Sequence, residues 1–201
     1  HRVDRRQRQM CIRDRVFSLG LNLVIVAGAE LFTGNNLIVM AWASGKVSTK
    51  ALLRNWGIVY IGNFIGSIAT AVMLFASKQF LNGGGAVGLT ALNIAKAKVE
   101  LGFWQAIALG ILCNALVCLA VWMTFSARST LDKIAAIIFP ISAFVAAGFE
   151  HSIANMYFIP IALFIKNYAS SDFWQLISKT PADYASITWA NFLIKNLIPV
   201  T

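Results

Sequence analysis

Three ionisable residues of this 201-residue chain stand out where apolar stretches are interrupted: Glu30, Glu150 and His151. An ionisable side chain at membrane depth is by default a functional candidate. Because its ordinary pKa is about 6.5, a histidine can donate a hydrogen bond or a proton to a small anion near neutral pH. The alternative for His151 is a structural role, held by internal hydrogen bonds. For both glutamates the favoured interpretation is structural, a carboxylate that caps freed backbone N–H groups or pairs with a neighbour.

The apolar stretches around these residues indicate membrane spans. Hydrophobic residues make up 58% of the chain and charged residues 12%, which excludes a soluble globular domain and favours an all-α integral membrane protein. Two spans are uninterrupted, over residues 56–76 and 103–125. Two other spans are interrupted: one covers residues 16–29 and resumes at 37–43, and the other covers residues 134–149 and resumes at 153–165. A partial span covers residues 185–200.

Two interrupted spans in corresponding positions are typical of inverted repeats with a binding site at the breaks. The order of broken, full, full, broken and partial spans fits a six-helix inverted repeat that lacks the first span and part of the last. We expect Thr33 at the first break and His151 at the second to meet near the midplane and face one pore. The half-helix ends at the breaks would direct unpaired N–H groups to the same space, which favours a small monovalent anion or its conjugate acid.

Nearly half of the net charge of +9 lies at the amino terminus, where residues 1–15 contain six arginines and two aspartates. This segment is interpreted as a non-native or artefactual basic tail, with a polybasic patch on anionic lipid as the alternative. Residues 16–201 are then a partial membrane channel domain. Its basic residues are scattered between apolar spans, which argues against a nucleic-acid partner.

Catalytic and metal-binding patterns are absent from the sequence, so we expect neither an enzyme nor a cofactor or metal site. Cys113 and Cys118 lie about 140° apart on a helix, which predicts two separate thiols.

Three segments, in order, resemble signatures of the formate/nitrite transporter family: residues 25–34 (IVAGAELFTG), 110–120 (GILCNALVCLA) and 149–156 (FEHSIANM). Residues 126–133 and 196–201 bring the resemblance closest to the formate channel branch. The one departure, Ala115 in place of a larger apolar residue, is a packing change. The resemblance implies an aquaporin-like fold, a homopentamer with a pore in each protomer, and a bacterial inner (plasma) membrane location.

The resemblance also implies roles for individual residues. His151 would be the central pore histidine and Thr33 its partner, with Lys98 and Asn114 on the path to them. The hydrophobic constrictions would be formed by Phe17, Leu21, Leu31, Phe32 and Phe144. Apart from the resemblance, we expect Glu30, Glu150 and Asn155 to be structural polar groups at the helix breaks.

These expectations describe a channel or transporter for formate, a small weak-acid anion, with a proton accompanying it. Hydrophobic constrictions around a lone histidine admit a neutral acid better than its anion. We expect Lys98 and the helix ends to attract formate, and His151 to let it pass as formic acid or close to it. The alternatives are a nitrite or hydrosulfide channel of the same family or, in another class, a non-conducting membrane subunit or defective fragment.

Overall fold

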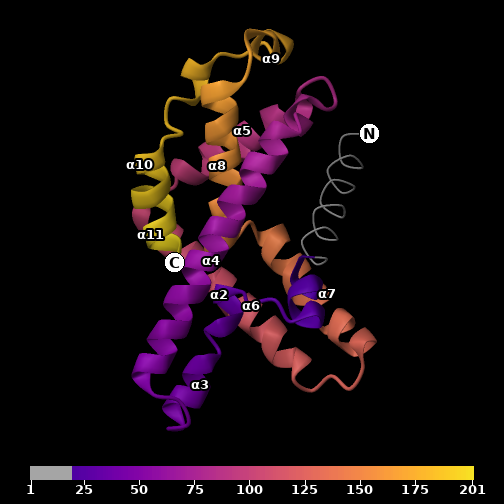
Figure 1. The fold of residues 1–201 in the computed structure, drawn as a ribbon, viewed down its shortest axis with the longest axis vertical. Helices are drawn as coiled ribbons and strands as arrows, with labels where there is room; N and C mark the ends of the chain where they lie inside the picture. Colours follow the sequence, from indigo (N-terminus) through magenta and orange to yellow (C-terminus); the bar gives the residue numbers. More distant parts are fainter. Residues whose placement is uncertain (1–19) are drawn as a thin grey trace. The chain divides into compact units, whose positions relative to one another are not determined.

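The structure, a computed structural model, describes residues 20–201, and this part of the chain is built from helices joined by turns (Figure 1). The elements are, in chain order, a helix at Gly20–Ala27, α2 (Phe32–Asn35), α3 (Ile38–Ala43), α4 (Thr49–Ala76), the 3-10 turn η1 (Gln79–Leu81), α5 (Ala86–Val99), α6 (Phe103–Thr124), α7 (Thr130–Ala147), α8 (Ser152–Tyr168), α9 (Ser171–Leu176), the 3-10 turn η2 (Pro181–Tyr184), α10 (Trp189–Asn191), the π-helix η3 (Phe192–Leu197) and α11 (Ile198–Val200).

Three of these helices, α4, α6 and α7, are long and apolar enough to cross a membrane. A fourth span is formed if Gly20–Ala27 and Phe32–Ala43, which meet at a 55° bend, count as one broken helix. The two uninterrupted spans predicted from the sequence are confirmed as α4 and α6. Helix α4 begins earlier than predicted because the Ser48 hydroxyl accepts a hydrogen bond from the Ala51 N–H (3.3 Å) in the first turn.

Helix α7 differs from the sequence prediction, in which residues 134–149 are too short to span a membrane alone. The helix starts at Thr130 because Ser129 and Asp132 form a capping box. The Ser129 hydroxyl accepts from the Asp132 N–H (3.2 Å), and the Asp132 carboxylate accepts from the Ser129 N–H (3.0 Å). The resulting 18 residues reach the length of a span before the break at Gly148.

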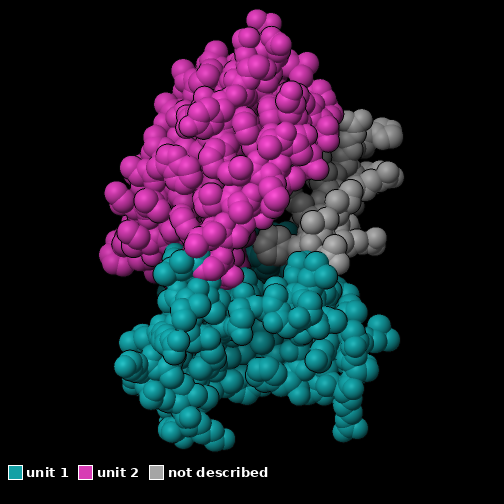
Figure 2. All heavy atoms as spheres, in the orientation of Figure 1, with its two compact units in different colours: residues 1–61, 111–149 teal, residues 62–110, 150–201 magenta. Residues whose placement is uncertain are grey.

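The chain forms two compact units, shown in different colours in Figure 2. Within the described residues, unit 1 comprises residues 20–61 and 111–149, and unit 2 comprises residues 62–110 and 150–201. The boundary between Phe149 and Glu150 falls within the second break. The core of unit 1 is a cluster of small and branched apolar side chains with one aromatic ring: Leu21, Cys113, Val117, Ala120, Ile137, Ile141 and Phe144.

In unit 2, α5 lies alongside α8 (Figure 1). The segment between α8 and α10 is tied back to these helices by two lysines. Lys166 donates to the Ile187 carbonyl (2.8 Å), and Lys96 donates to the Asp183 carbonyl (3.0 Å). At the turn η2, the Thr180 N–H and hydroxyl both donate to the Asp183 carboxylate, which lowers the pKa of that carboxyl. These contacts fix where α10 and η3 begin.

Gly88 of α5 lies at a tight approach in unit 2. A Cβ at this position would lie 2.7 Å from the Phe173 ring and 2.9 Å from the Phe80 carbonyl oxygen. The Phe80 oxygen belongs to the backbone and cannot rotate away, so a larger residue must displace the chain.

We therefore expect Gly88→Ala to destabilise the protein by about 1–3 kcal/mol through overpacking. Gly57→Ala is the matched control, because Gly57 is also helical and a Cβ there meets nothing within 4 Å. The control should be neutral or stabilising by up to about 1 kcal/mol, because alanine is the better helix former. Unfolding midpoints in detergent compare the two, and a Gly88→Ala protein as stable as the control would contradict the packing.

Candidate functional site

The second helix break is formed by Gly148, where α7 ends, and by His151, which precedes α8. Gly148 has a positive φ of 69°, a left-handed conformation that glycine adopts without strain. His151 is extended (φ −117°, ψ 116°), and its Nδ1 accepts a hydrogen bond from the Ala154 N–H at 3.1 Å. A histidine whose Nδ1 accepts carries its proton on Nε2 in the neutral ring. His151 therefore caps α8 and presents Nε2 as an N–H donor.

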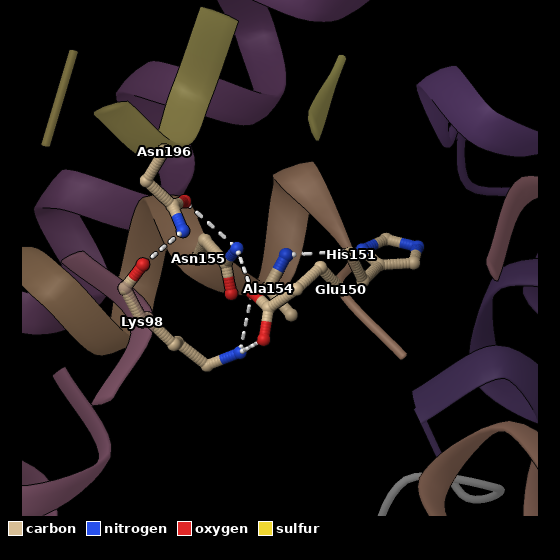
Figure 3. A network of polar contacts seen from close by, with 6 residues as sticks. All are labelled: Lys98, Glu150, His151, Ala154, Asn155 and Asn196. Carbon is tan, nitrogen blue, oxygen red and sulfur yellow. Dashed lines mark hydrogen bonds and ion pairs between the residues drawn. The ribbon is translucent and has the colours of Figure 1, made fainter. Parts of the chain in front are cut away.

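Glu150, next to this histidine, forms an ion pair with Lys98 at the end of α5 (Figure 3). The Lys98 Nζ lies 2.9 Å from each carboxylate oxygen, and the exposed fractions of the Lys98 and Glu150 side chains are 16% and 8%. The ammonium also lies 6.0 Å from the centre of the Phe158 ring. A buried carboxylate needs such a partner, because desolvation of an unpaired charge costs several kcal/mol.

Two fully buried asparagines complete a closed ring of hydrogen bonds with this pair. The Asn155 Nδ2 donates to the Glu150 carboxylate (2.7 Å) and to the Asn196 side-chain carbonyl (2.8 Å). The Asn196 Nδ2 in turn donates to the Lys98 backbone carbonyl (3.1 Å). Figure 3 shows the Glu150 side chain directed toward this ring and the His151 imidazole directed away from it. The ring of hydrogen bonds thus fixes Glu150 on one side of the break, and the His151 imidazole lies on the opposite side.

Asn196 is a site residue that the sequence analysis did not identify. It lies in the π-helix η3, where the Ile198 N–H donates to the Leu193 carbonyl, five residues earlier. Pro199 has no N–H to offer the Lys195 carbonyl, so a regular α-helical bond is lost at this turn. An amide inside an apolar stretch must find a partner, and this was the available signal for Asn196.

The environment of Lys98 differs from the expected one. The sequence analysis places a positive charge at the entrance of a pore, where it attracts anions. In the structure Lys98 forms an ion pair with Glu150, so its charge is compensated at the second break. The anion-attracting groups that remain at this break are the first N–H groups of α8.

The first break, in unit 1, contains Glu30, Thr33 and their neighbours. Glu30 is exposed, and its Oε2 accepts a hydrogen bond from the Asn35 Nδ2. Thr33 is 1% exposed, and its backbone carbonyl accepts from the Cys118 thiol at 3.5 Å. Thr33 belongs to unit 1 and His151 to unit 2. That the two residues meet at one pore therefore stays a prediction.

Of the residues expected to form constrictions, Leu31 and Phe32 lie at the first break. Leu31 packs against the core cluster that contains Leu21 and Phe144, so these three belong to one apolar region of unit 1. The Phe32 ring makes edge-to-face contacts with Tyr60 (5.0 Å between centres) and Trp56 (6.3 Å). Phe17 lies outside the described residues.

Asn114 lies half-buried on α6, and its side-chain oxygen is buried without a hydrogen-bond partner in the described part of the chain. In the described part of the chain, neither Cys113 nor Cys118 of this helix forms a disulfide. Over residues 20–201, no three His, Cys, Asp or Glu side chains gather as a metal site.

Comparison with known proteins identifies the class of protein that this fold and site define. A sequence model of the formate/nitrite transporter family matches residues 5–201, and the chain belongs to this family. It is 45% identical over 185 residues to the formate channel FocA of Escherichia coli (strain K12), and 43% identical over 186 residues to FocA of Haemophilus influenzae. These matches cover 92% of this chain but 65% and 66% of the two relatives.

Solved structures confirm the all-helical membrane fold. A pentameric formate channel with formate bound superposes with a TM-score of 0.90 and 50% identity, over 95% of this chain and 75% of that one. An FNT family ion channel superposes with a TM-score of 0.76 and 28% identity, over 95% of this chain and 69% of that one. With its apolar helices, this establishes the chain as a multi-pass membrane protein.

The Lys98–Glu150 pair makes a direct prediction for stability. Lys98→Met leaves a buried carboxylate without its cation, which we expect to cost about 3–5 kcal/mol. The double variant Lys98→Met with Glu150→Gln removes both charges and should recover most of that loss. Unfolding midpoints of the two variants and of Glu150→Gln alone, all in the same detergent, measure the coupling. A Lys98→Met protein with wild-type stability would show that the pair is not buried.

Proposed function

We propose that this chain is the protomer of a membrane channel that passes formate, a small weak-acid anion, together with a proton. The observation that carries the proposal is the second break, where a buried histidine caps a 17-residue half-helix in a chain of the formate/nitrite transporter family. Both FocA relatives and the first of the solved structures are called formate channels, and this supports formate as the substrate.

The chemistry of the break suits a small anion. The first N–H groups of α8 have no partners within the helix and give its amino terminus a partial positive charge. The His151 Nδ1 satisfies one of them, and its Nε2 is a neutral donor for a carboxylate oxygen. Apolar surroundings disfavour a full charge, so the site favours a substrate that crosses as the neutral acid or close to it.

The other predicted residues support this role in two ways. Lys98, Glu150 and Asn155 hold the backbone of the second break and so position the imidazole. At the first break, we propose Thr33 as a second pore residue with Glu30 as its structural neighbour, and Asn114 as a polar residue of the pathway. The apolar constrictions would consist of Leu21, Leu31, Phe32 and Phe144, with Phe17 as a further member.

The proposal extends to the assembly and its location. The solved formate channel that this chain resembles is pentameric, and we propose that this chain likewise forms a homopentamer with one pore in each protomer. A bacterial inner (plasma) membrane is the proposed location, because the named relatives come from bacteria. Formate, protons and lipid are then its partners.

Formate flux into liposomes containing the purified protein tests the proposal. His151→Phe removes both the cap and the N–H donor, and its flux should lose the pH dependence of the wild type. His151→Asn is the folding control, because asparagine is a good N-cap residue and retains a donor.

Wild-type pH dependence in His151→Phe would contradict the role of the histidine. Absence of formate, nitrite and hydrosulfide flux from the wild type would favour a non-conducting subunit.

A further inference from the structure

The two helix breaks have the same backbone conformation, although they lie about 120 residues apart. Gly28 and Gly148, each two residues before a glutamate, have φ values of 72° and 69°. Leu31 and His151, each directly after that glutamate, have φ and ψ of −120° and 125°, and of −117° and 116°. This similarity pairs Glu30 with Glu150.

The side-chain hydrogen bonds repeat as well. In unit 2 the Asn155 Nδ2 donates both to Glu150, five residues earlier, and to the Asn196 side-chain carbonyl. In unit 1 the Asn35 Nδ2 donates both to Glu30, also five residues earlier, and to the Asn55 side-chain carbonyl at 3.0 Å. Each break therefore carries a carboxylate and two amides bonded in the same order.

The third member of each set, Asn55 on α4 and Asn196 on η3, lies at a similar distance along the chain from a hydroxyl that accepts a helix N–H. Asn55 lies seven residues after Ser48, whose hydroxyl accepts from the Ala51 N–H. Asn196 lies eight residues after Thr188, whose hydroxyl accepts from the Asn191 N–H (3.1 Å). The additional residue lies in the π-helix η3, whose wider turn takes up one extra residue. Asn196 therefore lies on the same side of its helix, relative to Thr188, as Asn55 does relative to Ser48.

The two sets differ in what surrounds them. His151 caps α8 with its side chain, whereas Leu31 makes no side-chain cap at α2. The side-chain Nδ2 of Asn196 donates to the Lys98 backbone carbonyl. In unit 1, by contrast, the Asn35 backbone carbonyl accepts from the Trp56 indole N–H at 3.1 Å. The bonds that the two breaks share are therefore the two donated by the central asparagine, one to the glutamate and one to the other asparagine.

We propose that Glu30, Asn35 and Asn55 form a second polar triad, equivalent by internal repeat to the triad of Glu150, Asn155 and Asn196. Its task is to position the loop that carries Thr33, as the other triad positions His151; the inference rests on the proposed channel function. Thr33 lies between Glu30 and Asn35, so the hydrogen bond between these two side chains spans the residue. Asn35 is accordingly a positioning residue.

Replacement of the central amide by a carboxyl tests the proposal through pH. In Asn35→Asp a second carboxylate faces Glu30, and the two repel while both are ionised. Protonation of one of them restores a hydrogen bond across the pair. We expect formate flux, relative to wild type at the same pH, to fall about tenfold near pH 7.5 and to recover largely by about pH 5.

Three further variants make the result specific. Asn155→Asp should show the same recovery in acid, because it alters the equivalent position of the other triad. Asn35→Leu should lose flux at every pH, because it cannot regain the bond. Asn36→Asp is the matched control, since it places the same charge one residue away and should follow the wild type.

Unfolding midpoints in detergent separate failure of this inference from failure of the proposed function. If the wild type carries no formate, the channel proposal fails, but Asn35→Asp must still be less stable than Asn36→Asp at neutral pH and regain stability in acid. Asn35→Asp protein that matches Asn36→Asp in flux and in midpoint at every pH would overturn the second triad.

Discussion

A helix that breaks within an apolar environment must have its backbone and its charges satisfied by other parts of the protein, because lipid provides no hydrogen bonds. At the second break His151 satisfies an N–H group of α8, and the Lys98–Glu150 pair neutralises the charge next to it. The Asn155 Nδ2 donates to the Glu150 carboxylate and to the Asn196 side-chain carbonyl. This requirement governs the rest of unit 2, because the partners come from three different segments of the chain.

The packing of unit 2 follows from the need to bring those segments together. Helix α5 must end beside α8 for Lys98 to reach Glu150, and the close contact of Gly88 with Phe173 and Phe80 packs the first turn of α5 against α9 and η1. The lysine contacts that anchor the segment before α10 set the start of the π-helix that contains Asn196. Stability and function are thus linked, since the same contacts that hold the fold hold the imidazole in place.

The fold class, the two uninterrupted spans and the positions of the breaks could be predicted from the sequence, because apolar length and its interruption are local properties. The predicted start of α7 was wrong, because the capping box at Ser129 lies outside the apolar stretch. The pairing of Lys98 with Glu150 and the role of Asn196 could not be predicted, because these contacts join residues 52 and 98 positions apart. Ionisable residues in apolar stretches indicated where the site lies; its hydrogen bonds depend on tertiary structure.

The central claim is that His151 caps α8 through Nδ1 and so presents a neutral Nε2–H donor. The chain contains two histidines, so His1→Ala leaves His151 as the single source of imidazole signals. The ¹⁵N chemical shifts of this variant in bilayers at neutral pH report the tautomer directly. The account predicts a protonated Nε2 and an unprotonated, hydrogen-bonded Nδ1. A ring protonated on Nδ1 would contradict it.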